Sequence, residues 1–88
     1  MPAVCKLTFG KELPRDITET QLALAVRVTE AVYGPPRVRI GAGYCYAADG
    51  TVLVLDISTE VGQHIACVLI GLLTWAHGED SFAVERDE

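Results

Sequence analysis

The chain has 88 residues, of which 50% are hydrophobic and 22% are charged, and its formal net charge is −5. This length fits one small domain over residues 1–88, and this composition excludes a disordered tail. The longest apolar run is well short of the roughly 18 residues of a membrane span, and no basic stretch leads into an apolar one, so we expect neither a membrane segment nor a secretory signal.

Charge is divided unevenly along the chain. Residues 1–39 contain six basic and four acidic residues, whereas residues 40–88 contain eight acidic residues and Arg86 as their one base. Nucleic-acid affinity depends on neutralising phosphates with Lys and Arg, so we expect no direct binding to nucleic acid. An acidic half favours a solvated surface or docking to a basic partner.

Three cysteines stand far apart, at Cys5, Cys45 and Cys67, and no C-x-x-C spacing occurs. An odd number at wide spacing is not typical of a disulfide framework, and it favours a reducing, cytoplasmic compartment. Each cysteine lies in an apolar segment, so we expect all three thiols to be buried.

The first half of the chain predicts a strand, a helix and a second strand. Apolar and polar side chains alternate over residues 3–9, which is typical of a strand. A capping box that starts at Thr18 predicts a helix from that residue, and Gly34 followed by two prolines predicts its end. Residues 37–46 alternate again and predict the second strand, with its two tyrosines on the core face.

The second half predicts a hairpin, a long helix and a last strand. Asp and Gly at residues 49–50 are typical of a tight turn, and the β-branched segment 51–57 predicts the third strand. Ser and Thr at residues 58–59 offer an N-cap for a second helix that extends to His77. A short fourth strand follows over residues 82–86.

This order of elements predicts an α+β domain of the ferredoxin-like class. A β-α-β-β-α-β succession with right-handed crossovers gives a four-stranded, mostly antiparallel sheet with two helices on one face. An order of elements defines architecture and leaves function open.

The second helix has an unusual feature, because residues 65–73 contain no polar side chain. A surface helix needs only one apolar stripe, so an all-round apolar helix predicts a further contact, with a partner protein or with a second copy of the chain. Aromatic and aliphatic anchors dominate interface energies. The residues that we expect to bind the partner lie on this helix and in the acidic segment after it: Leu69, Leu72, Trp75, Glu79 and Asp80.

Few residues form a pattern that could support chemistry. His64 and Cys67 have helical spacing, but a structural zinc site needs four ligands, so we expect no metal and no cofactor. No nucleophile and base stand at a recognisable spacing. Lys6, Arg37 and Arg39 could gather on the open face of the sheet and hold a carboxylate or phosphate.

One family resemblance covers roughly residues 1–40. Pro2 follows the initiator Met, the helical segment 27–32 is followed by Gly-Pro-Pro at residues 34–36, and a strand is expected next. This arrangement resembles the tautomerase superfamily, whose members use an N-terminal proline amine as a base. The resemblance implies that Pro2 is the base and that Arg37 or Arg39 binds a substrate carboxylate.

Three functions follow from these observations. The leading hypothesis is a small acidic non-catalytic interaction module, either an inhibitor of a larger, nucleic-acid-handling protein or a homo-oligomerising adaptor. The first alternative is a tautomerase-like enzyme. The second alternative is a sensor domain for a small anionic ligand.

Overall fold

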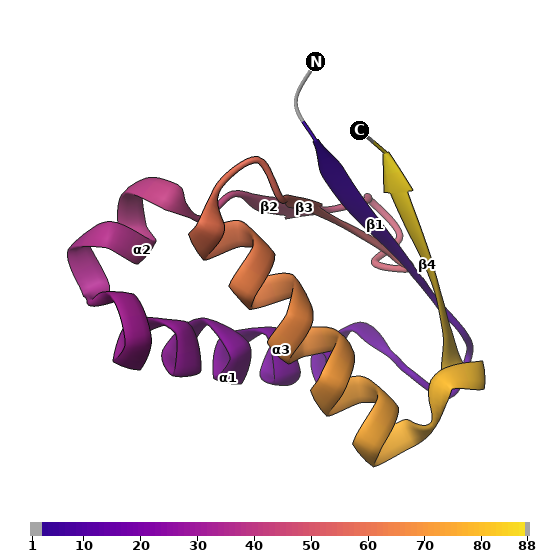
Figure 1. Cartoon of the computed structure of the whole chain (residues 1–88). Coiled ribbons are helices and arrows are strands. Elements are labelled where there is room, and N and C mark those ends of the chain that lie inside the picture. The colour runs from indigo at the N-terminus through magenta and orange to yellow at the C-terminus, as the bar shows by residue number, and fades with distance from the viewer. Residues whose placement is uncertain (1–2, 88) are drawn as a thin grey trace.

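Four antiparallel strands form an open sheet that is packed against helices in the computed structural model, which describes residues 3–87 (Figure 1). The order of the strands across the sheet is β2-β3-β1-β4. The predicted α+β class with a four-stranded antiparallel sheet is confirmed, but the described residues form three α-helices where two were predicted. In chain order the elements are β1 (Val4–Phe9), α1 (Arg15–Tyr33), α2 (Pro35–Gly41), β2 (Tyr44–Tyr46), β3 (Val52–Asp56), α3 (Glu60–His77), the 3-10 turn η1 (Glu79–Ser81) and β4 (Phe82–Asp87).

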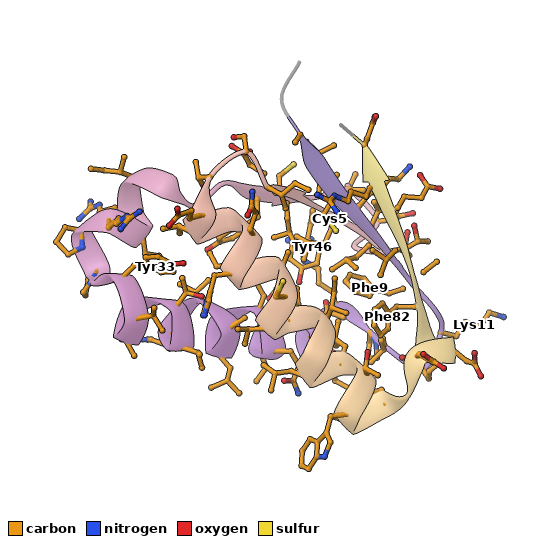
Figure 2. The ribbon with its side chains drawn as sticks, in the orientation of Figure 1. Cys5, Phe9, Lys11, Tyr33, Tyr46 and Phe82 are labelled. Atoms are coloured by element: carbon orange, nitrogen blue, oxygen red, sulfur yellow. The ribbon has the colours of Figure 1, made fainter. Side chains whose placement is uncertain are left out.

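The two faces of the sheet differ sharply in exposure. Leu7 of β1 pairs with Leu53 of β3 and with Val84 of β4, and side chains paired in this way point to the same face. That face lies toward α1 and α3, and the aromatic rings of Phe9 and Phe82 are also found there (Figures 1 and 2). Side chains one position away, such as that of Lys6, point to the open face.

Leucines and isoleucines from the sheet and from α3 form the centre of the core. Leu7, Leu53, Leu69 and Leu73 have no exposed surface, and Ile65 has almost none. Full burial of such a side chain contributes about 1.5–3 kcal/mol relative to exposure. This core fixes the positions of α1 and α3 relative to the sheet.

Helix α1 begins one turn earlier than the sequence predicts. It starts at Arg15, and Pro14 occupies the N-cap position with an extended backbone. The predicted capping box at Thr18 is therefore wrong, because that hydroxyl lies inside the helix, donates to the carbonyl of Arg15 and lies 3.0 Å from the hydroxyl of Tyr46. A proline is well tolerated at a helix start, where its missing N–H has no intrahelical role.

The predicted second strand is wrong over its first half. Residues 37–41 belong to helix α2, and strand β2 is limited to Tyr44–Tyr46. Gly34 ends α1 with a φ of 88°, a left-handed conformation that glycine adopts at low cost. The two prolines after it fill the first positions of α2, so they begin a helix there instead of preceding a strand.

The caps and turns of the second half are confirmed. Thr59 is the N-cap of α3 and its hydroxyl accepts the backbone N–H of Gly62 at 3.0 Å. The helix ends at His77, as predicted. In the hairpin, Gly50 has a φ of 75° and the carboxylate of Asp49 accepts the backbone N–H two residues further on. Among the described residues, no helix combines the length and apolarity needed to cross a bilayer.

Candidate functional site

The apolar circumference of α3 is covered mostly from within the chain. Its buried residues, which include Ile65 and Leu73, face the sheet and α1. Leu69 has no exposed surface, so the prediction that it contacts a partner is wrong. Leu72 is half-buried and packs against the core. Only at the end of the helix does a large apolar side chain remain uncovered, because Trp75 is 88% exposed.

The other predicted contact residues follow Trp75 closely. Glu79 and Asp80 are exposed and belong to η1, the 3-10 turn after α3. The end of α3 therefore presents an uncovered indole followed by two carboxylates. Aromatic anchors are enriched at the centre of contact surfaces, and polar groups form the rim around them.

A second exposed apolar group lies on α1 and was missed in the sequence. Leu24, Val28 and Val32 are 47%, 39% and 61% exposed, and their spacing of four residues places them along one side of the helix. We call these three residues the α1 stripe. The sequence carries this signal as a second set of apolar positions on the helix, beside the buried set. Helix α1 packs against α3, so the α1 stripe and Trp75 belong to the same helical layer.

A hydrogen bond joins α1 to α3 inside this layer. The hydroxyl of Thr29 lies 2.7 Å from Nδ1 of His64 and also donates to the carbonyl of Ala25 at 2.8 Å. Because the hydroxyl proton is used in the bond to Ala25, Nδ1 of His64 carries the proton and donates to Thr29. The ring of Tyr33 meets His64 edge to face, with centroids 5.5 Å apart. The side chain of His64 therefore links α1 to α3. No group of three or more potential metal ligands is found within residues 3–87.

The three basic residues predicted to share the open sheet face do not lie together. Lys6 is on that face, but Arg37 and Arg39 are on α2, because the segment that contains them is helical. Arg37 lies 3.4 Å from the carboxylate of Glu60, and its guanidinium stacks over the ring of Tyr33. The expected common site of Lys6 and the two arginines is therefore wrong.

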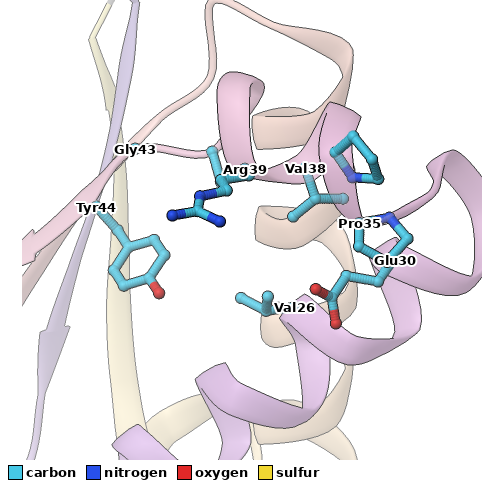
Figure 3. A pocket seen from close by; sticks show the side chains of 9 residues that line it. Val26, Glu30, Pro35, Val38, Arg39, Gly43 and Tyr44 are labelled. Carbon is cyan, nitrogen blue, oxygen red and sulfur yellow. The ribbon is translucent and has the colours of Figure 1, made fainter.

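Arg39 instead borders a cleft between α1, α2 and β2, which we call the α2 cleft (Figure 3). The cleft has a volume of about 730 Å³. Val38 is buried in its wall, and Tyr44 of β2 reaches it from the core side of the sheet, the side that the alternation of residues 37–46 predicts. The cleft is lined by Val26, Glu30, Pro35, Pro36, Val38, Arg39, Ala42, Gly43 and Tyr44.

The three cysteines are free, but only one is buried. Cys5 lies in the core, whereas Cys45 and Cys67 are exposed, so the prediction of three buried thiols is wrong for two. Cys5 and Cys67 both line a hollow of about 260 Å³ beside β4. Burial raises the pKa of Cys5, and the charge of Arg86 only partly offsets this. Cys5 therefore remains a protonated, weakly nucleophilic thiol at neutral pH.

The base implied by the tautomerase resemblance, Pro2, lies outside the described residues. Its implied substrate-binding partners, Arg37 and Arg39, lie on α2, and Arg37 is already engaged by Glu60. Comparisons with protein-family models, with curated proteins and with solved structures found no match.

Proposed function

We propose that the protein is a non-catalytic interaction module that docks to a partner protein through its helical layer. The observation that supports this most is the set of large apolar side chains left in water there, namely Trp75 and the α1 stripe. Scattered exposed apolar residues are ordinary, but three at a spacing of four on one helix form a strip that a partner can cover. Trp75 supplies the kind of aromatic anchor on which interfaces depend.

The charge of the chain favours a partner with a basic surface. Glu79 and Asp80 follow Trp75 within one short segment of the chain, and the chain as a whole carries a net charge of −5. Complementary charge speeds association and discriminates among partners. Proteins that bind nucleic acid present basic surfaces to phosphates, so inhibition by covering such a surface is the form of this activity that the charge favours.

A second copy of the chain is the competing occupant. A two-fold contact would bring each residue near its own copy or near a residue that shares its surface. If such a contact centred on Trp75, the acidic turns of both copies would approach each other, which opposes association. We therefore favour a different protein as the partner.

The fold class and the compartment belong to the same proposal. The β-α-β-β-α-β succession, with two long helices on one face of the sheet, supports the ferredoxin-like class, to which α2 is an addition. The exposed thiols of Cys45 and Cys67 favour a reducing compartment such as the cytoplasm.

Photo-crosslinking from defined positions tests the interface. A photoreactive residue at position 28 or 75 should crosslink a specific protein in cells that make this chain, whereas the same residue at Lys6, on the open sheet face, should not. With that partner purified, Trp75→Ala should weaken binding on the order of 30-fold or more, as expected of a hot spot. Thr8→Ala on the open face is the matched control and should leave the affinity unchanged.

Three results would overturn the proposed interface. One is unaltered affinity of Trp75→Ala and Val28→Asp for the crosslinked partner. Another is an equal yield of crosslinks from Lys6. The third is a stable oligomer in light scattering that Val28→Asp dissociates, which would make a second copy the occupant. Circular dichroism of each variant shows that its fold is intact.

A further inference from the structure

The α2 cleft holds two opposite charges that are not paired with each other. Arg39 comes from α2 and Glu30 from α1, and both border the same space (Figure 3). No hydrogen bond or ion pair within residues 3–87 involves the guanidinium of Arg39. A guanidinium in a concave site without a carboxylate partner is available to an anion.

The only ion pair that Glu30 makes in the described part of the chain is a weak one. Its carboxylate lies 3.8 Å from the guanidinium of Arg27, whose side chain is 83% exposed. Such a long pair with an exposed arginine contributes little, since solvent screens it. The Glu30 side chain is itself only 26% exposed, so neighbouring residues cover most of it while its carboxylate has no strong partner.

The remaining side chains that line the cleft are apolar apart from one phenol. Val26, Val38 and Ala42 line it together with two prolines, whose rings have little conformational freedom to lose. Tyr44 is 48% exposed, and its side chain lines the same cleft as Arg39 (Figure 3). A concavity that combines apolar side chains with a few polar groups is a common composition for a small-molecule site, and a volume of about 730 Å³ is in the usual range.

We propose that the α2 cleft binds a free amino acid with an apolar side chain. The guanidinium of Arg39 would hold the carboxylate through charge-assisted hydrogen bonds, and Glu30 would hold the ammonium group. The valines and prolines would contact the side chain. A ligand with both charges satisfies both residues at once, whereas a simple anion would be repelled by Glu30 and would leave it with only its weak pair to Arg27.

This site is independent of the proposed protein interface. Val26 and Glu30 lie two positions on either side of Val28, and residues two apart in a helix do not share a face. Substitutions in the cleft therefore leave the α1 stripe intact, and the two proposals can fail separately.

Titrations followed by ¹H–¹⁵N NMR test the site with L-leucine and L-phenylalanine. Each amino acid should shift the amide signals of residues 37–44 in a saturable way. The N-acetyl derivatives lack the ammonium group and the amides lack the carboxylate. Each blocked form should bind at least about tenfold more weakly, because one charge-assisted hydrogen bond is lost.

Variants assign the two charges to their roles. Arg39→Gln should weaken both amino acids at least about tenfold and remove the preference for leucine over leucine amide. Glu30→Gln should remove the preference for leucine over N-acetyl-leucine. Arg37→Gln is the matched control, since Arg37 is on the same helix but pairs with Glu60, and it should bind as the unmodified chain does.

The proposal is overturned if neither amino acid shifts the amide signals of residues 37–44. It is also overturned if N-acetyl-leucine binds as well as leucine, which would indicate a simple anion site. Equal losses of amino-acid affinity in Arg39→Gln and Arg37→Gln would also overturn the proposal, because they would show a general effect of charge. The amide spectrum of each variant reports its fold in the same experiment.

Discussion

Replacement of Gly62 by alanine should destabilise the fold, whereas the same replacement at Gly71 should stabilise it. Both glycines are in α3. A Cβ built on Gly62 would lie 1.9 Å from the carbonyl oxygen of Asp56 and 3.2 Å from Oγ1 of Thr59, the N-cap of the helix. A Cβ on Gly71 would meet nothing within 4 Å beyond the adjoining residues and backbone of its own helix. The pair separates helix propensity from packing on a single helix.

The magnitudes follow from these two environments. Alanine is better than glycine in a helix by about 1 kcal/mol, and at the exposed Gly71 this gain is not opposed. For a domain of this size, 1 kcal/mol raises the Tm by about 4–8 °C. At Gly62 the added Cβ and the carbonyl oxygen of Asp56 must move apart by more than about 1 Å, because a carbon and an oxygen normally stay roughly 3.3 Å apart. Overpacking of this kind costs about 1–3 kcal/mol or more, and loss of the Thr59 cap adds about 1 kcal/mol.

After subtraction of the helix gain, Gly62→Ala should lose about 2 kcal/mol or more of the free energy of unfolding. Urea unfolding followed by circular dichroism measures both variants, with an unchanged m-value as the sign that the same folded state is compared. A Gly62→Ala chain as stable as the original would refute the close approach of α3 to Asp56. A destabilised Gly71→Ala chain would show that Gly71 is covered in solution.

Two further predictions concern a buried contact and an exposed one. Thr29→Val removes the oxygen that accepts from Nδ1 of His64, so it should lower the free energy of unfolding by about 1–2 kcal/mol in urea titrations, and an unchanged midpoint would contradict this contact. Hydrogen bonds from the backbone N–H and hydroxyl of Thr51 lower the pKa of Asp49 from its ordinary value of 3.8. A carboxylate whose pKa is lower in the folded state than in the unfolded state stabilises the fold fully at a pH above its unfolded-state pKa. This stabilisation is lost as the pH falls through the folded-state pKa. Because Asp49→Asn lacks this carboxylate, its Tm should fall less between about pH 5 and pH 2 than that of the original chain. An equal fall in Tm on acidification of both chains would contradict this role of Asp49.

Local signals explain the part of the fold that the sequence predicts well. The strand alternation of residues 3–9 depends on neighbouring side chains alone, as do the N-cap at Thr59 and the helix end before Gly78. The prediction of a strand that includes residues 37–41 is wrong for a related reason. A helix of seven residues has too few turns to display a helical period, and the apolar positions 38 and 40 imitate a strand, although Ile40 is 89% exposed on α2.

The candidate site was harder to predict because it depends on orientation and on distant segments. A helix that is apolar on every side has no polar face to orient it, so Leu69 and Trp75 were equally plausible contacts before the structure buried one and exposed the other. The α2 cleft combines Glu30, Arg39 and Tyr44 from three elements. No spacing in the sequence relates these residues, since their proximity follows from how α2 packs between α1 and β2.

Helix α1 explains why the two proposed surfaces can be tested one at a time. One side of it is buried through Leu22, Ala25 and Thr29, and that side is locked to α3 by the bond to His64. The α1 stripe lies on a second side, and Glu30 is on a third, where it borders the cleft. Because the buried side fixes the helix, a change such as Glu30→Gln should not rotate the α1 stripe. Loss of amino-acid binding with unchanged partner affinity in that variant would therefore place the two activities on separate surfaces of one rigid helix.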